Sequence, residues 1–153
     1  RRHVFCDDSI VRGTQLDKQA DRLYKEGCKE VNVRIACPPL LYPCRFINFS
    51  RSKNEYDLIT RRYVRGHEGE DADISKYVDP NGESYKGMVE FIREKLNLTS
   101  LAFQTVDDLV AAIGLPRERL CTYCWTGEDV SMPGSCAHGC SSCPHACSVN
   151  PKK

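Results

Sequence analysis

The 153-residue sequence lacks the features that mark several broad classes of protein. Its 22 lysine and arginine residues against 21 aspartate and glutamate residues leave a net charge of +1. No strong field of one sign therefore favours nucleic acid or a membrane surface as a partner. Its apolar runs are also far shorter than the ~20 residues that a transmembrane helix requires. We expect neither nucleic-acid binding nor membrane insertion.

The amino terminus, Arg1-Arg2-His3, has neither a methionine nor a hydrophobic signal segment. We therefore interpret the chain as a piece excised from a longer one, and the missing signal carries little information on localisation. A content of 41% hydrophobic and 28% charged residues is ordinary for a soluble globular protein.

Cysteine, in contrast, is plentiful. Of ten cysteines, six fall near the carboxyl end: Cys121, Cys124, Cys136, Cys140, Cys143 and Cys147. An even count is compatible with secreted disulfides, but the enzyme-like first half and the scattered early cysteines favour a reducing compartment. Clustered cysteines bind metal more often there. We expect a cytoplasmic protein.

Hydrophobic periodicity predicts an α/β fold. The runs Val4–Cys6 and Val31–Ile35 are typical of strands, and the spacing of apolar residues over 16–24 predicts a helix between them. Strand, helix, strand over such a length is a βαβ unit with parallel strands. With Leu101–Phe103 the count reaches about three strands, and an open parallel sheet usually has five or more. We expect the remaining strands before Arg1.

The middle and the later part of the chain are less regular. Residues 54–62 and 88–96 have helical patterns, whereas charge and turn residues dominate 65–82 and predict an exposed excursion. Thr105 to Asp108 has the pattern of a capping box, with Asp in place of the usual Glu, ahead of a helix that Gly114 and Pro116 end.

The stretch from His3 to Thr14 carries the most chemical information. Apolar residues lead into Asp7 and Asp8, and a Ser/Gly/Thr loop then leads into a helix. At the carboxyl end of a parallel strand, loop N–H groups and a helix N-terminus converge on a site for an anion. The two carboxylates suit ribose hydroxyls or Mg²⁺. Together they predict a ribose-5-phosphate site, and the alternative is that the acids form a turn while Thr14 caps the helix.

This stretch resembles the phosphoribosylpyrophosphate (PRPP) motif of the type I phosphoribosyltransferases, and more narrowly that of the glutamine PRPP amidotransferase family. The resemblance implies that PRPP is bound by eight residues: Asp7, Asp8, Ser9, Ile10, Val11, Arg12, Gly13 and Thr14. Asp7 and Asp8 would hold the ribose and Mg²⁺, and the residues from Ser9 on would hold the 5′-phosphate. Gly13 would let the backbone approach the phosphate closely.

The resemblance covers most of residues 3–127 and implies the carboxyl-terminal part of a phosphoribosyltransferase domain over 1–127. Residues from about 60 to 87 are interpreted as an insertion, and 128–153 as an irregular Cys-rich tail. Gln15 stands where the family commonly has a second Thr. The family's glutaminase domain, with its nucleophilic cysteine, is absent, so we expect no catalytic residue within this chain and no activity of the fragment alone.

The reaction that the resemblance implies is a glycosyl transfer. Ammonia from glutamine displaces pyrophosphate from PRPP and gives 5-phosphoribosylamine, the first step of purine biosynthesis. The implied partners are PRPP, the purine nucleotides AMP and GMP as inhibitors, a glutaminase domain of the parent chain, and further copies in a homo-oligomer.

Some members of the family hold a [4Fe–4S] cluster, and this sequence has matching contexts at Pro43-Cys44 and at Cys121-x-x-Cys124 before Trp-Thr-Gly. Since such a cluster takes four thiolates, the resemblance places the fourth before Arg1. The role would be structural. The alternative is a set of free thiols.

The tail pattern Cys136-x₃-Cys140-x₂-Cys143-x₃-Cys147 is compatible with a tetrahedral zinc site or with an irregular, oxidation-prone segment. Two other functions remain open for the chain as a whole. One is a salvage phosphoribosyltransferase, against which the Val-Arg-Gly loop and the C-x-x-C ending count. The other is a non-catalytic module that senses nucleotides or binds metal.

Overall fold

The computed structural model describes residues 1–44 and 55–128. Three strands and five α-helices run along this part of the chain: β1 (Arg2–Asp7), α1 (Thr14–Lys25), β2 (Glu30–Ile35), α2 (Ile59–Glu68), α3 (Glu83–Lys95), β3 (Ser100–Phe103), α4 (Val106–Ile113) and α5 (Tyr123–Thr126). Short 3₁₀ helices cover Glu55–Asp57, Ile74–Tyr77 and Arg117–Arg119. None of the helices in these ranges is both long and apolar enough to cross a bilayer.

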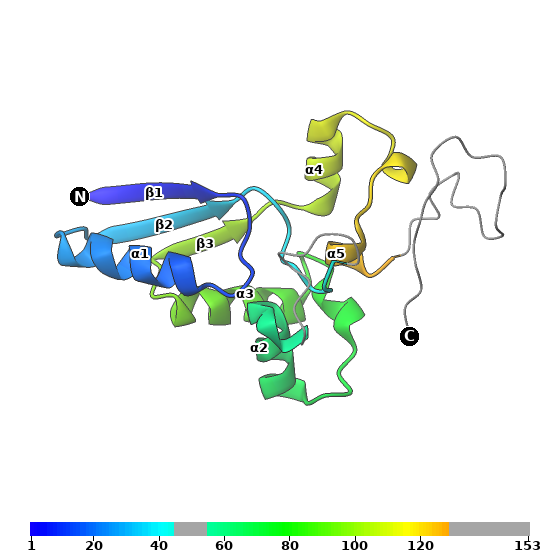
Figure 1. The fold of residues 1–153 in the computed structure, drawn as a ribbon, viewed down its shortest axis with the longest axis horizontal. Coiled ribbons are helices and arrows are strands. Elements are labelled where there is room, and N and C mark those ends of the chain that lie inside the picture. Colours follow the sequence, from blue (N-terminus) through cyan, green and yellow to red (C-terminus); the bar gives the residue numbers. More distant parts are fainter. Residues whose placement is uncertain (45–54, 129–153) are drawn as a thin grey trace, which may run out of the picture.

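The strands form one parallel sheet in the order β1-β2-β3, as the βαβ pattern predicts. In the register, Phe5 lies beside Val33, and Val33 beside Leu101. All three carboxyl ends therefore meet at one edge of the sheet, beyond which the connection after β2, α4 and α5 are found (Figure 1).

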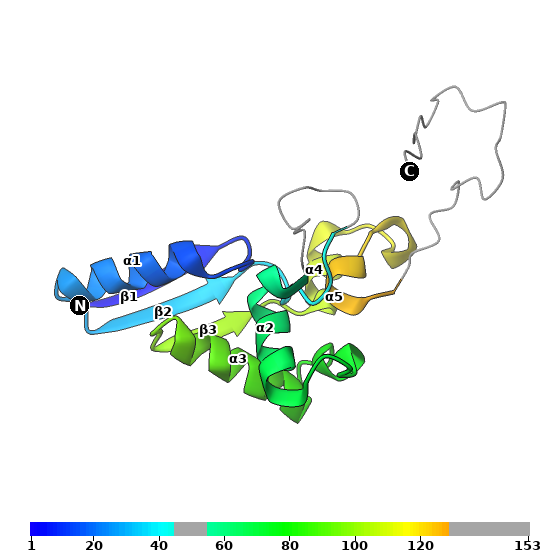
Figure 2. The ribbon, with the colours of Figure 1, turned by 60° about the horizontal axis from the view of Figure 1, so that its bottom comes forward.

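Helices α1 and α3 cover the same face of the sheet (Figures 1 and 2). The alternation of β2 explains this arrangement, since Val31, Val33 and Ile35 are buried while Arg34, on the opposite face, is exposed. Leu16 and Ala20 of α1 and Met88 and Ile92 of α3 join these strand residues in the core. On the other face Val4 keeps 72% of its surface exposed.

Residues 65–82 differ in part from the expected exposed excursion. Arg65 to Asp71 are exposed, but Tyr77 belongs to the core. The Tyr77 hydroxyl donates a hydrogen bond to Glu68, and burial is the main cause that raises the pKa of Tyr77. The helix expected over 54–62 is shifted, because a 3₁₀ turn precedes it and α2 begins at Ile59. Charged residues dominate this stretch of the sequence, so the few apolar residues that reach the core do not form a recognisable pattern.

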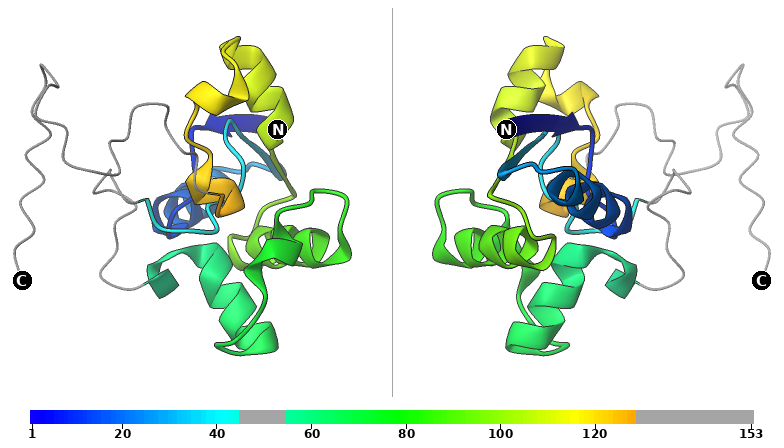
Figure 3. Two further views of the ribbon diagram at one scale, coloured as in Figure 1. Left: turned by 90° about the vertical axis from the view of Figure 1, so that its right-hand side faces the viewer. Right: turned by 90° about the vertical axis from the view of Figure 1, so that its left-hand side faces the viewer.

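Helix α4 begins as predicted. Thr105 is its N-cap, and its hydroxyl oxygen accepts a hydrogen bond of 3.1 Å from the N–H of Asp108. The reciprocal half of the expected capping box is wrong, because the Thr105 N–H donates to the Gln104 side chain and not to Asp108. End-on, α4 stands clear of the layer formed by the sheet with α1 and α3 (Figure 3), and it has no fully buried residue.

Candidate functional site: a phosphate loop and a group of thiols

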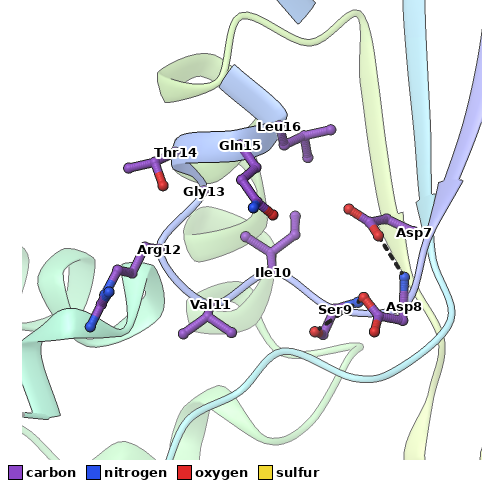
Figure 4. A pocket seen from close by; sticks show the side chains of 10 residues that line it. All are labelled: Asp7, Asp8, Ser9, Ile10, Val11, Arg12, Gly13, Thr14, Gln15 and Leu16. Atoms are coloured by element: carbon purple, nitrogen blue, oxygen red, sulfur yellow. Dashed lines mark hydrogen bonds between the residues drawn. The ribbon is translucent and has the colours of Figure 1, made fainter. Parts of the chain in front are cut away.

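A pocket of about 390 Å³ lies where β1 passes into α1. Its lining is ten consecutive residues, from Asp7 to Leu16 (Figure 4). The volume falls in the range of small-molecule sites, and the place, at the carboxyl end of a parallel strand, is where open α/β sheets bind ligands. The structure thus brings all eight predicted PRPP-binding residues around one pocket and adds Gln15 and Leu16 to it.

The two acids each fold one oxygen back onto the chain. Asp7 Oδ1 accepts the N–H of Asp8 at 3.0 Å, and Asp8 Oδ1 accepts the N–H of Ser9 at 2.7 Å. These turns fix the direction of both side chains at the mouth of the loop. The second oxygen of each carboxylate takes no part in these bonds, so the pair can still accept hydroxyl groups or coordinate a hard cation.

The N-terminus of α1 faces the loop without a side-chain cap. Gly13 is the N-cap, with φ 77°, and as a glycine it has no side chain that could accept from the first turn. The interpretation of Thr14 as a cap is therefore wrong, and its hydroxyl is left for another partner. Uncapped N–H groups at a helix N-terminus, together with the helix dipole, favour a bound anion.

Gly13 is needed for a reason that the sequence did not indicate. A Cβ at this position would lie 2.8 Å from Leu96 Cδ2 and 3.0 Å from Ile59 Cδ1, and the positive φ already disfavours other residues. The loop is therefore pressed onto the start of α2 and the end of α3. Ile10, predicted as a phosphate-loop residue, has only 4% of its surface exposed and belongs to the core. It contributes backbone and shape, not a side-chain ligand.

Two polar contacts also join the loop to the start of α2 and to the 3₁₀ turn just before it. Arg12 Nη2 forms an ion pair of 3.0 Å with Asp57 Oδ2, and the N–H of Ile59 donates to the Val11 carbonyl at 2.8 Å. Asp57 and Ile59 could not be recognised from the sequence, because an isolated Asp-Leu-Ile does not indicate which loop it will contact.

The second group of predicted residues lies in the connection after β2 and in α5. The N–H groups of Leu41 and Tyr42 both donate to the Cys124 carbonyl, at 2.8 and 3.0 Å. At the end of α5, a Cβ on Gly127 would lie 2.6 Å from the Tyr42 ring, so the glycine permits this close approach. The segment around Cys121 and Cys124 thus folds back onto the connection that carries Cys44.

The three thiols lie near one another. The pKa of Cys124 is raised to about 12, mainly by burial. The charge of Cys44, a hydrogen bond with Cys44 and, to the smallest extent, the charge of Cys121 also raise it. Cys44 and Cys124 are therefore in direct contact, while Cys121 is more exposed. No three His, Cys, Asp or Glu side chains within 1–44 and 55–128 are arranged to hold a single metal ion. Cys136, Cys140, Cys143 and Cys147 lie outside the described residues.

Individual relatives and solved structures resemble this chain, although no family model does. No protein-family model matches the chain. An amidophosphoribosyltransferase of Methanothermobacter thermautotrophicus is 30% identical over 128 residues, which cover 84% of this chain and 22% of the relative. A solved structure described as the allosteric regulatory enzyme of purine biosynthesis has a TM-score of 0.60 and 27% identity, over 83% of this chain and 23% of its own.

A second solved structure is the glutamine PRPP amidotransferase of B. subtilis in complex with ADP and GMP. It has a TM-score of 0.55 and 28% identity, over 86% of this chain and 25% of its own. The chain spans about a quarter or less of the length of these proteins. By sequence and by fold, it matches the carboxyl-terminal phosphoribosyltransferase part of the amidophosphoribosyltransferases.

Proposed function

We propose that the chain forms the PRPP-binding portion of a glutamine-dependent amidophosphoribosyltransferase. The observation that carries this proposal is the pocket of ten consecutive residues, since it is made from the stretch that resembles the PRPP motif. The names of the relatives and of the solved structures support the same activity.

Different residues of the pocket would bind the ribose and the phosphate, according to the chemistry of their side chains and backbone. Asp7 and Asp8 would accept the ribose hydroxyls, because each keeps a carboxylate oxygen outside the local turns. The 5′-phosphate would lie against the loop N–H groups and the uncapped start of α1, with the hydroxyls of Ser9 and Thr14 as further donors. Two acids beside an anion site are what a phosphorylated sugar requires.

The proposed reaction replaces the C1–pyrophosphate bond of PRPP by a bond from C1 to ammonia, with pyrophosphate as the leaving group. Because positive charge develops at C1 while the leaving group departs, the chain would act mainly by holding the sugar in place and by electrostatics. The carboxylates of Asp7 and Asp8, as the residues proposed to hold the ribose, would favour that charge. When bound, Mg²⁺ would neutralise charge on the pyrophosphate; Asp7 and Asp8 fit it as ligands, since Mg²⁺ commonly takes one or two carboxylates together with substrate phosphates.

Purine nucleotides share ribose 5-phosphate with PRPP. The B. subtilis protein has been solved with ADP and GMP, which supports the proposal that AMP or GMP competes with PRPP for this loop. A glutaminase domain as the source of ammonia and a homo-oligomeric assembly are further parts of the proposal. The cytoplasm, a reducing compartment, is a further part of the proposal, because the cysteines scattered through the first half of the chain favour it.

A [4Fe–4S] cluster is proposed at Cys44, Cys121 and Cys124. The donor set fits in part, because Cys44 contacts Cys124 and the charge of Cys121 reaches it, and a cubane cluster takes four thiolates. When bound, the cluster would fasten α5 to the connection after β2. Full-length protein purified without oxygen should show visible sulfur-to-iron absorbance that Cys124→Ser removes and Cys28→Ser keeps. Equal spectra for both variants would contradict the assignment.

The catalytic proposal is tested by separating two activities of the full-length protein. We expect Asp7→Asn with Asp8→Asn to abolish PRPP-dependent synthesis and to leave glutamine hydrolysis measurable, since only the sugar site is damaged. The matched control is Asp107→Asn with Asp108→Asn, a second pair of consecutive acids at the start of α4, which should keep both activities. Full turnover of PRPP in the first variant would exclude the assignment, and equal loss of both activities would indicate a role in folding.

A further inference from the structure

The segment from Asp57 to Ile59, where a 3₁₀ turn leads into α2, touches the phosphate loop in three ways. The Asp57 carboxylate accepts from Arg12 Nη2 at 3.0 Å. The backbone N–H of Ile59 donates to the Val11 carbonyl at 2.8 Å. The Ile59 side chain lies against Gly13, 3.0 Å from where a Cβ would stand. Three successive loop residues are thus held by a segment that is distant in the sequence and that lines none of the pocket.

The backbone bond has a consequence for the direction of the loop's donors. No described peptide bond is cis, and in a planar trans peptide the C=O and the following N–H point in opposite directions. Since the Val11 carbonyl points to Ile59, the N–H of Arg12 points away from α2. The contact with α2 therefore sets which way this donor of the loop faces.

The ion pair determines where the Arg12 side chain goes. Arg12 is the single cationic residue among the ten that line the pocket, and its side chain extends toward α2, away from Asp7 and Asp8 (Figure 4). The two partners keep 56% and 40% of their side-chain surface exposed. A pair this exposed contributes little to stability, so its main effect is on position.

We infer that Asp57 is a positioning residue of the pocket: by holding Arg12 at the 3₁₀ turn before α2, it keeps Val11–Gly13 in the conformation that binds the phosphate of a phosphorylated sugar. The inference rests on the proposed function, and it names a residue outside the PRPP motif. Without the carboxylate, the guanidinium is released toward the pocket's own acids and the loop loses one of its three fastenings. The first effect puts a cation on the acids proposed to hold the ribose, and the second loosens the loop proposed to hold the phosphate, so both weaken binding of the phosphorylated sugar.

The test is calorimetric titration of the full-length protein with ribose 5-phosphate. We expect Asp57→Asn to weaken binding about threefold to fivefold, the upper part of what an exposed ion pair contributes, and Asp57→Glu to restore most of it. The matched control is Glu26→Gln, which breaks the Arg22–Glu26 pair of the same 3.0 Å length at the far end of α1. Its binding and the thermal unfolding midpoints of all variants should stay unchanged.

A double-mutant cycle with Arg12→Ala identifies the route of the effect. Asp57→Asn should cause no further loss in the Arg12→Ala background, because the carboxylate acts through the guanidinium. Unchanged or tighter binding by Asp57→Asn alone overturns the inference while the proposed function stands, since the wild-type protein still binds. Absence of wild-type binding overturns the proposed function, and this inference with it.

Discussion

The pocket of Asp7 to Leu16 and the thiol group are built in opposite ways. The pocket is lined by ten consecutive residues from one strand, one loop and one helix. The thiol group joins Cys44 to Cys121 and Cys124, on segments far apart in the sequence that meet only because α5 folds back onto the connection after β2. The difference teaches that the residues lining the pocket are neighbours in the sequence, whereas the contacts that hold segments together come from distant parts of the chain. Even the pocket takes its shape from Asp57, Ile59 and Leu96.

The largest effect is expected at the thiols of the metal-free protein. A pKa of about 12 leaves roughly one Cys124 in ten thousand as thiolate at pH 8, and the thiolate is the reactive form. Iodoacetamide should therefore label exposed Cys121 well before Cys124, as peptide mass spectrometry will report. Because the pKa is raised, Cys124 labelling should become about tenfold faster per pH unit as the pH rises toward that value.

Equal labelling rates at pH 8 would contradict the packing of Cys124 against Cys44. They would also mean that the thiol group is exposed to solvent, and that it does not join the connection after β2 to α5.

The next largest effect is expected from Gly13→Ala. A residue with a Cβ at this positive φ costs about 1–2 kcal/mol, and the contacts with Leu96 and Ile59 add overpacking of about 1–3 kcal/mol. Gly27 is the matched control, since it has φ 86° and nothing within 4 Å of an added Cβ. Urea unfolding should show a loss about twice as large for Gly13→Ala as for Gly27→Ala.

Similar losses for the two glycine variants would show that the loop is not pressed onto α2 and α3. In that case the shape of the pocket, like its lining, would depend on neighbouring residues alone, and only the thiol group would depend on long-range contacts.

The smallest effect compares the starts of two helices. Thr105→Ala removes the N-cap of α4 and should cost about 1 kcal/mol of unfolding free energy. Thr14→Ala should change stability by less than about 0.5 kcal/mol, because Thr14 makes no cap, yet it should weaken ribose 5-phosphate binding. A stability loss at Thr14 as large as at Thr105 would mean that the hydroxyl serves the helix and not a ligand.

Short-range signals account for what the sequence could predict. The alternation of Val31, Val33 and Ile35, the cap at Thr105 and the acid–loop–helix order from Asp7 to Thr14 each depend on neighbouring residues. The parallel sheet and the position of the pocket follow from them.

Long-range packing accounts for what the sequence did not show. Tyr77 lies within a run of charged and turn residues, yet it is buried with only 1% of its surface exposed. The pairing of Asp57 with Arg12 joins residues 45 positions apart. A residue pattern indicates which face of a helix or strand is buried, but not which distant loop will contact that element. The burial of Tyr77 and the Asp57–Arg12 pair are therefore seen only in the structure.

Hydrogen–deuterium exchange of the full-length protein, with and without ribose 5-phosphate, tests the central claim most directly. We expect slower exchange in peptides that cover Ser9 to Leu16, where the loop N–H groups and the start of α1 would bind the phosphate, and no change in α4. Protection that spares this stretch, and lies instead around the separate pocket beside Arg34 and Gln104, would contradict it.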